Sequence, residues 1–210
     1  MLKRKIEAAL LEWKEDKRKK PLVVKGPRQC GKTFSVKKFA EDNYQHVVYI
    51  NFFKNPAYAS AFSGSLEVDD LVTNISAMLH SDEFVPGDTC LILDEIQDCP
   101  DARTSLKFWK EDGRYDVICT GSLLGVHGYG SYLDASGKPQ APRSVPVGYE
   151  TTLDMYPLDF EEFLWANGIG PNIFKKIRKC MEDEMPVPDA IHTSLHSLML
   201  QYTVVGGMPE

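Results

Sequence analysis

The sequence contains no apolar run long enough to cross a membrane and no excess of positive charge. No uncharged apolar stretch approaches the roughly 20 residues that span a bilayer, and the N-terminus lacks the apolar core of a secretory signal. The formal net charge is −6, from 24 Lys and Arg against 30 Asp and Glu, so a global nucleic-acid-binding surface is not supported and only a local patch stays open. We therefore expect a cytoplasmic protein with no membrane partner.

Paired cysteines are also missing. The chain has five cysteines, an odd number, and none of them belongs to a C-x-x-C pair. Scattered cysteines in a cytoplasmic chain are typical of free thiols. Cys90 and Cys119 fall within apolar stretches, where a thiol acts as a small apolar side chain. The base-recognition motif N-K-x-D is absent as well, which disfavours a GTPase.

One stretch of the chain matches the phosphate-binding loop G-x-x-x-x-G-K-[ST] at every required position. It consists of Gly26-Pro27-Arg28-Gln29-Cys30-Gly31-Lys32-Thr33. A short apolar stretch, residues 21–25, precedes the loop, and residues 34–40 follow it with apolar positions at helical spacing. Strand, glycine-bounded loop and helix, in that order, form the context in which this motif binds phosphate.

Each position of this loop has a physical role in holding a nucleotide. Gly26 and Gly31 lack a Cβ, so the main chain can turn tightly and approach an anion. The loop N–H groups lie at a helix N-terminus, which attracts negative charge. Lys32 supplies a positive charge for the β- and γ-phosphates and is assigned to binding and catalysis, while the Thr33 hydroxyl is a hard ligand for Mg²⁺. The other residues assigned to nucleotide binding, in or beside the loop, are Pro27, Arg28, Gln29, Cys30 and Phe34.

A second motif, Leu91-Ile92-Leu93-Asp94-Glu95, follows about 60 residues after the loop. Its two carboxylates come directly after an apolar strand, at the edge where α/β sheets bind ligands. Asp94 is placed to support Mg²⁺, either through a water molecule or through Thr33. Glu95 is placed to orient the water that attacks the γ-phosphate. We interpret Gln97 and Asp98 as turn residues first and as contacts to that water or metal second.

A hydroxyl at the end of the fourth predicted strand is a candidate sensor of the γ-phosphate. Thr120 and Ser122 both lie there, the residues do not decide between them, and Ser122 is included in the predicted site. No arginine finger can be identified. Three arginines could reach a nucleotide from the same chain or from a neighbouring subunit, namely Arg103, Arg114 and Arg143.

Strands alternate with helices up to residue 157, and only helices follow. The predicted strands are 21–25, 46–52, 89–94, 116–120 and 147–155, and the main predicted helices are 2–13, 34–40, 68–79, 102–112, 158–167, 171–182 and 189–205. This pattern predicts an α/β protein, a doubly wound parallel sheet with a helical C-terminal region. Residues 121–146, rich in Gly, Ser and Pro, are predicted to form a loop or hairpin insertion.

Two histidines on the last predicted helix resemble half of a zinc site. His192 and His196 have the i, i+4 spacing of H-E-x-x-H, but the glutamate is missing and no third ligand is apparent. We interpret them as histidines of a helix surface. The predicted metal ligands are therefore Thr33 and Asp94 alone.

Taken together, the motifs resemble those of prokaryotic AAA-type P-loop ATPases. The segments GPRQCGKT, LILDEIQ, CTGSLLG, YPLDFEEFL and GGMPE occur in the order seen in that family, and LILDEIQ and PLDFEEF are the most specific of them. The resemblance implies a five-stranded ASCE-type sheet of order 5-1-4-3-2, nucleotide binding by residues 26–33, Mg²⁺ support from Asp94, water activation by Glu95 and sensing by residues 120–122. Family members typically continue into a C-terminal domain of unknown function.

We accordingly expect three parts: an N-terminal helix and basic linker (1–20), a P-loop ATPase core (21–157) and a helical, lid-like region (158–210) that stops before a further C-terminal domain. The leading hypothesis is an ATPase that uses ATP and Mg²⁺ to drive a conformational change in a partner or in that domain, with self-association as a possible source of an arginine. The alternative is a nucleotide-dependent switch or assembly module with little turnover. A third class is a small-molecule phosphotransferase, but we find in the sequence no set of acids or arginines that would bind its acceptor.

Overall fold

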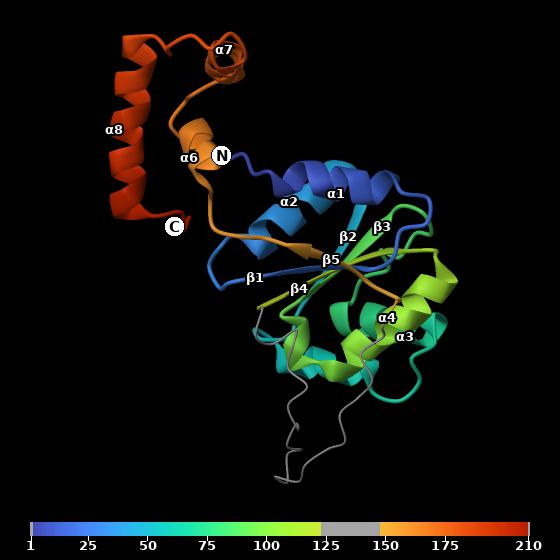
Figure 1. The fold of residues 1–210 in the computed structure, drawn as a ribbon. Helices are drawn as coiled ribbons and strands as arrows, with labels where there is room; N and C mark the ends of the chain where they lie inside the picture. Colours follow the sequence, from blue (N-terminus) through green and yellow to red (C-terminus); the bar gives the residue numbers. More distant parts are fainter. Residues whose placement is uncertain (1, 123–147, 210) are drawn as a thin grey trace.

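The computed structural model describes residues 2–122 and 148–209, and at its centre lies a five-stranded parallel sheet. The strands are β1 (Leu22–Gly26), β2 (His46–Asn51), β3 (Thr89–Asp94), β4 (Asp116–Ser122) and β5 (Thr151–Asp154). Their spatial order is β2-β3-β4-β1-β5 (Figure 1), which confirms the predicted order 5-1-4-3-2. Every neighbouring pair is parallel, as the helical crossovers between strands require.

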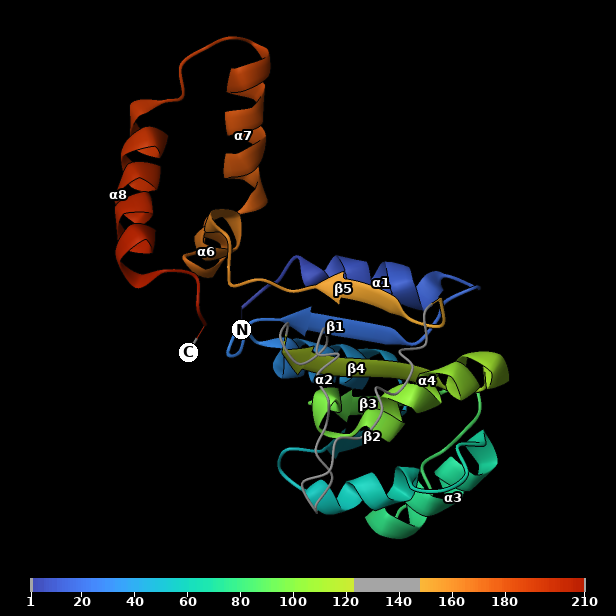
Figure 2. The same ribbon diagram turned by 60° about the horizontal axis from the view of Figure 1, so that its bottom comes forward.

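Helices cover both faces of the sheet (Figure 2). One face packs against α1 (Ile6–Glu15) and α2 (Lys32–Asn43). The other face packs against α3 (Val68–Leu79), α4 (Pro100–Asp112) and the 3₁₀ segment η1 (Pro56–Phe62). A short 3₁₀ turn, η2 (Ile96–Asp98), follows β3.

The central strands are buried on both sides, and their alternate residues enter two separate cores. In β3, Leu91 and Leu93 belong to the core under α3 and α4, while Ile92 belongs to the core under α1 and α2. This double burial explains why the strands appear in the sequence as unbroken apolar runs. Cys90 and Cys119 are fully buried within them, and all five cysteines are free thiols, as predicted.

A helical region follows β5 and lies beyond the edge toward which the strands point (Figures 1 and 2). It contains α6 (Phe160–Ala166), α7 (Pro171–Glu182) and α8 (Asp189–Val205). The last helix has no buried residue, so few of its contacts hold it in place. It is joined to the start of the region through Leu158, whose N–H donates to the Gly207 carbonyl at 2.6 Å and whose carbonyl accepts from the Tyr202 hydroxyl at 2.7 Å.

Several predicted boundaries differ from those in the structure. The N-terminal helix begins at Ile6 rather than residue 2, and the N–H of the preceding Lys5 donates at 2.7 Å to the Glu162 carboxylate, outside the helix. The 3₁₀ segment η1 was not predicted. The fifth strand is shorter than residues 147–155, and residues 123–147, which hold most of the predicted insertion, lie outside the described residues.

Two sequence features concern membranes and metals. In the described part of the chain, no helix is both long and apolar enough to cross a membrane.

His192 and His196 stack with 6.3 Å between ring centroids on α8. Within residues 2–122 and 148–209, no group of three or more His, Cys, Asp or Glu residues is arranged to hold a metal ion.

Replacing Leu91 with alanine tests how much the central strand contributes to stability. Leu91 is fully buried, so we expect Leu91→Ala to lower the free energy of unfolding by about 2–5 kcal/mol. Val204→Ala is the control, because that side chain is 86% exposed and its loss is expected to change stability by less than about 0.5 kcal/mol. Urea unfolding measures both, and equal losses would contradict the assignment of the core.

Candidate functional site

The phosphate loop connects the end of β1 to the start of α2, and its shape depends on two glycines. A Cβ on Gly26 would lie 2.0 Å from the Met155 carbonyl oxygen, so only glycine fits beside the chain that leaves β5. Gly31 has φ +93° and immediately precedes α2, a left-handed conformation that favours glycine. Gln29 also has a positive φ of 63°. These turns bend the loop around the N-terminus of α2.

The Lys32 side chain folds back over the loop. It is 7% exposed, and its Nζ donates to the carbonyl oxygens of Gly26 at 3.0 Å and Pro27 at 2.6 Å. Its positive charge is therefore held inside the curve of the loop and beside the N-terminus of a helix. Both are positions where an anion would meet it.

Asp94, at the end of β3, is 1% exposed and is surrounded by hydrogen-bond donors. Its Oδ1 accepts from the hydroxyls of Thr33, at 2.9 Å, and Thr120. Its Oδ2 accepts from the Tyr49 hydroxyl and the Asn51 amide, each at 2.7 Å. Burial and the bond to Asp94 raise the pKa of Tyr49 to about 12, so the phenol stays protonated and donates. The two motifs of the sequence therefore meet at this carboxylate.

Glu95 follows in a left-handed conformation, with φ +56°, which is uncommon for a residue with a side chain. The chain turns sharply there, and Gln97 donates a hydrogen bond from its Nε2 to the Glu95 carboxylate. The neighbouring Asp98 has a raised pKa because of partial burial and the negative charge of Glu95, with Arg28 acting in the opposite direction. This end of β3 thus gathers negative charge across from the lysine of the loop.

A cavity of about 1340 Å³ lies between the phosphate loop and these acids. Its lining includes Glu95 and most of the predicted loop residues, together with apolar side chains from the segment after β2 and from the C-terminal segment: Arg28, Gln29, Gly31, Lys32, Thr33, Phe34, Phe53, Glu95, Gln97, Asp98, Val205, Met208 and Pro209. The predicted residues Gly26, Pro27, Cys30, Asp94 and Ser122 are not among the lining residues. Four of them lie directly behind the lining, because Lys32 bonds Gly26, Pro27 and Cys30, and Thr33 bonds Asp94.

The two candidate sensor residues occupy different places. Thr120 is 1% exposed and donates its hydroxyl to Asp94, so it is part of the network behind the loop. Ser122 lies next to Gly26 in the parallel register of β4 and β1, and it is partly exposed. Ser122 is thus the one beside the start of the loop.

Two of the three arginines predicted as possible fingers form ion pairs away from the loop. Arg103, on α4, pairs with Glu150 at 2.7 Å. Arg114 pairs with Asp69 and Asp112 just before β4 begins, at the edge of the sheet opposite the phosphate loop. Arg143 lies outside the described residues. Arg28 is exposed and lines the cavity itself.

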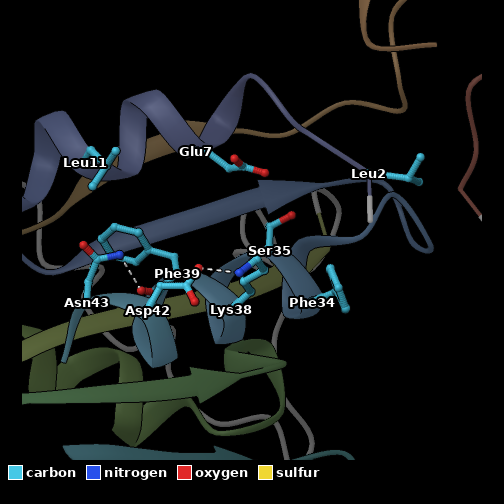
Figure 3. Close-up of a pocket in the computed structure, with 9 residues that line it drawn as sticks. All are labelled: Leu2, Glu7, Leu11, Phe34, Ser35, Lys38, Phe39, Asp42 and Asn43. Carbon is cyan, nitrogen blue, oxygen red and sulfur yellow. Dashed lines mark hydrogen bonds and ion pairs between the residues drawn. The ribbon is translucent and has the colours of Figure 1, made fainter. Parts of the chain in front are cut away.

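A second, smaller pocket lies between α1 and α2 (Figure 3). It measures about 110 Å³, and four apolar residues line it together with Glu7, Ser35, Asn43 and the Lys38–Asp42 ion pair. Small-molecule sites typically measure about 300–1,000 Å³, so this pocket is too small for a nucleotide. Phe34 lines both pockets and is 60% exposed.

Sequence reasoning missed several residues of the site. Tyr49 and Asn51 lie two residues apart on β2, so both face the same side of the strand and bond Asp94 on β3. The signal available in the sequence was a pair of polar residues near the end of an apolar strand. Phe53 and Val205 also line the cavity without having been predicted. Arg4, to which the sequence analysis gave no role, is buried against the loop.

Parallel strands, a glycine-bounded loop between β1 and a helix, and an acid pair at the end of β3, which β4 separates from β1, define a P-loop domain. Residues 18–164 match the family model described as AAA domain, which covers more than half of the chain. The chain therefore belongs to this AAA domain family. No curated protein sequence matches it.

Solved structures that resemble this chain include a Walker-type ATPase. The Walker-type ATPase PABY2304 of Pyrococcus abyssi superposes with a TM-score of 0.50 at 15% identity, over 100% of this chain and 65% of that one. PCH-2 of C. elegans gives 0.40 at 15% identity over 90% and 49%, and Orc1 of Aeropyrum pernix in complex with DNA gives 0.44 at 14% over 81% and 51%. At these identities the likeness concerns the fold alone. The chain spans about two thirds of the first protein and about half of the other two.

Replacing Gly26 with alanine tests the close approach of the loop to the end of β5. The added Cβ would overlap the Met155 main chain, so we expect Gly26→Ala to cost about 2 kcal/mol or more. The thermal midpoint is then expected to fall by roughly 4–8 °C. Gly170→Ala is the control, because nothing lies within 4 Å of its Cβ position. An unchanged midpoint for Gly26→Ala would contradict the described contact.

Proposed function

We propose that this chain binds ATP with Mg²⁺ in the cavity above the phosphate loop and hydrolyses it to ADP and phosphate. One observation carries the proposal. Lys32, Thr33 and Glu95 line a single cavity, and Thr33 is hydrogen-bonded to the buried Asp94 behind it. Membership of the AAA domain family supports the same assignment at the level of the fold.

The loop supplies positive charge and N–H donors for the phosphates. The Lys32 ammonium has three N–H donors and reaches two loop carbonyls, so a small rotation brings it to phosphate oxygens at the same place. The N–H groups at the start of α2 add the partial positive charge of a helix N-terminus. The other proposed nucleotide-binding residues of the loop are Gly26, Pro27, Arg28, Gln29, Cys30 and Gly31. Phe34 and Ser122 are the proposed residues at the margins of this site.

The residues at the floor of the cavity fit a magnesium ion. Thr33 Oγ1 and Asp94 Oδ1 lie 2.9 Å apart, and both are hard oxygen donors of the kind Mg²⁺ prefers. When bound, Mg²⁺ would neutralise charge that develops on the β- and γ-phosphates. Tyr49 and Asn51 hold the other carboxylate oxygen, so Asp94 presents Oδ1 toward Thr33 in a fixed orientation.

Glu95 is the proposed residue that positions the attacking water. Its carboxylate lies in the same cavity as Lys32, on the opposite wall from the loop, where an acceptor can orient water toward a γ-phosphate. A group in this role contributes typically 10²–10⁴-fold in rate. Lys32 would stabilise the charge of the leaving phosphate, which is the catalytic part of its role.

Apolar residues also line the cavity. We propose that they contact the base of the nucleotide and that those from the C-terminal segment belong to a lid. Phe34, Phe53, Val205 and Met208 provide an apolar rim, as ligand pockets generally have beside their polar groups. We propose that residues 1–20, 21–157 and 158–210 act as N-terminal support, ATPase core and lid, because the C-terminal segment reaches the cavity. Hydrolysis would then move this lid and a partner or further domain.

A nucleotide-dependent switch with little turnover is the second candidate. The hydrogen bond from Gln97 occupies part of the Glu95 carboxylate, which favours a state that binds ATP without activating water. In that case a partner, or an arginine from another copy of the chain, would complete the site. Turnover measured over a range of protein concentrations separates the two candidates, because self-association raises the specific activity.

Replacing Lys32 tests nucleotide binding. Lys32→Ala removes the buried ammonium that faces the cavity, so we expect it to abolish measurable ATP binding in a fluorescence titration. Lys38→Ala is the matched control on the same helix, because Lys38 forms a surface ion pair with Asp42 and lies outside the cavity. An unchanged Kd for folded Lys32→Ala would refute the assigned role.

Replacing Glu95 separates binding from hydrolysis. Glu95→Gln keeps the shape of the side chain, so ATP affinity is expected to stay within about threefold, while turnover falls by about a hundredfold or more. Asp98→Asn removes a charge from the same cavity and is expected to keep most of the activity. Steady-state phosphate release with and without Mg²⁺ measures both variants. Equal rates for wild type and Glu95→Gln would show that Glu95 does not activate water.

A further inference from the structure

Arg4 is a buried cation that no part of the proposed mechanism uses. Its residue exposure is 7%, and its guanidinium contacts three separate segments of the chain. Nη1 donates to the Cys30 carbonyl in the phosphate loop at 2.8 Å, Nη2 donates to the Tyr156 carbonyl after β5 at 2.7 Å, and Nε donates to Glu162 of α6 at 3.1 Å. One side chain therefore joins the N-terminus, the phosphate loop and the helical region.

The bond to Cys30 orients the peptide unit that follows it. In a trans peptide the carbonyl and the N–H point in opposite directions, so holding the Cys30 oxygen on the side of Arg4 directs the Gly31 N–H away from it. Gly31 lines the cavity, and its φ of +93° is a conformation that glycine adopts far more readily than other residues. The arginine thus limits the orientations open to one of the loop amides that would face a phosphate.

Glu162 keeps the arginine in place. It is 5% exposed, and its carboxylate also accepts from the N–H groups of Lys5, at 2.7 Å, and Asp159, at 3.1 Å. Within α6 it is the third-position glutamate of a capping box with Asp159. A planar guanidinium with a fixed fork of donors can serve these acceptors together, and a lysine ammonium of similar reach cannot.

We propose that Arg4 is a positioning residue for the phosphate loop, which it holds in the shape that binds nucleotide and ties to α6 through Glu162. This proposal rests on the proposed function, because the loop shape matters only if the loop binds a nucleotide. The Tyr156 bond adds to the same effect, since the preceding Met155 carbonyl is the atom that Gly26 approaches most closely.

The neighbouring lysine provides a matched control. Lys5 also joins the N-terminal segment to α6, through Asp159 at 2.6 Å and Glu161 at 2.7 Å, but its side chain is 47% exposed and bonds no loop residue. Lys5→Met therefore removes a link between the same two segments and leaves the loop contact intact. Arg4→Lys retains the charge and removes the fork of donors.

The experiment measures ATP affinity and amide hydrogen exchange in the full chain, at a temperature where each variant is folded. We expect Arg4→Lys to raise the Kd for ATP at least about tenfold and to speed exchange in residues 26–33 without nucleotide, since it loses charge-assisted bonds to the loop. Lys5→Met is expected to stay within about twofold in both measurements. Wild-type values for folded Arg4→Lys, or equal losses for Lys5→Met, would overturn the proposal.

Two further outcomes keep the inference separate from the proposed function. If the wild-type chain binds no ATP, the proposed function fails, and exchange in residues 26–33 still decides whether Arg4 holds the loop. If Arg4→Lys does not fold, Glu162→Gln takes its place, because glutamine keeps the capping bond and removes the counter-charge. A rise of about threefold or more in Kd would then support the role of the clamp, and an unchanged Kd would overturn it.

Discussion

Parallel strand pairing is the constraint on which the site depends. Because β1, β3 and β4 run in the same direction, their carboxyl ends meet at one edge of the sheet, where Gly26, Asp94 and Ser122 lie. Residues separated by about 30 to 100 positions in the sequence become neighbours there. The double burial of these strands makes the edge rigid, since alternate side chains are fixed in two cores.

The groups around the loop are arranged to satisfy one another. Cations hold loop carbonyls, with Lys32 over Gly26 and Pro27 and Arg4 over Cys30, while donors from three elements hold both oxygens of Asp94. Buried polar groups are costly without partners, so such a network has few alternative geometries. The loop and the acid pair are in this way preorganised for the phosphate and metal chemistry that we propose.

Elements with strong local signals were predicted closely. Four elements have the predicted bounds: the helices 68–79, 171–182 and 189–205 and the strand 89–94. Their bounds depend on apolar periodicity and flanking Pro or Gly residues, which are signals within the segment itself. The start of α1 was not predicted closely, and the N–H of Lys5 just before it bonds Glu162, which is far away in the sequence. The segment η1 was missed since its 7 residues make only about two turns at 3.0 residues per turn, too few to show a period in the sequence.

The amino-acid sequence alone determined the phosphate loop, the strand followed by the Asp94–Glu95 pair, and the family. These depend on short motifs whose residues are adjacent in the chain. Only the tertiary structure decided that Tyr49 and Asn51 hold Asp94, that Thr120 rather than Ser122 bonds it, and that Arg4 bonds the loop at Cys30. Such contacts join segments that are far apart in sequence. Their geometry follows from strand register and helix packing, which no single stretch of sequence contains.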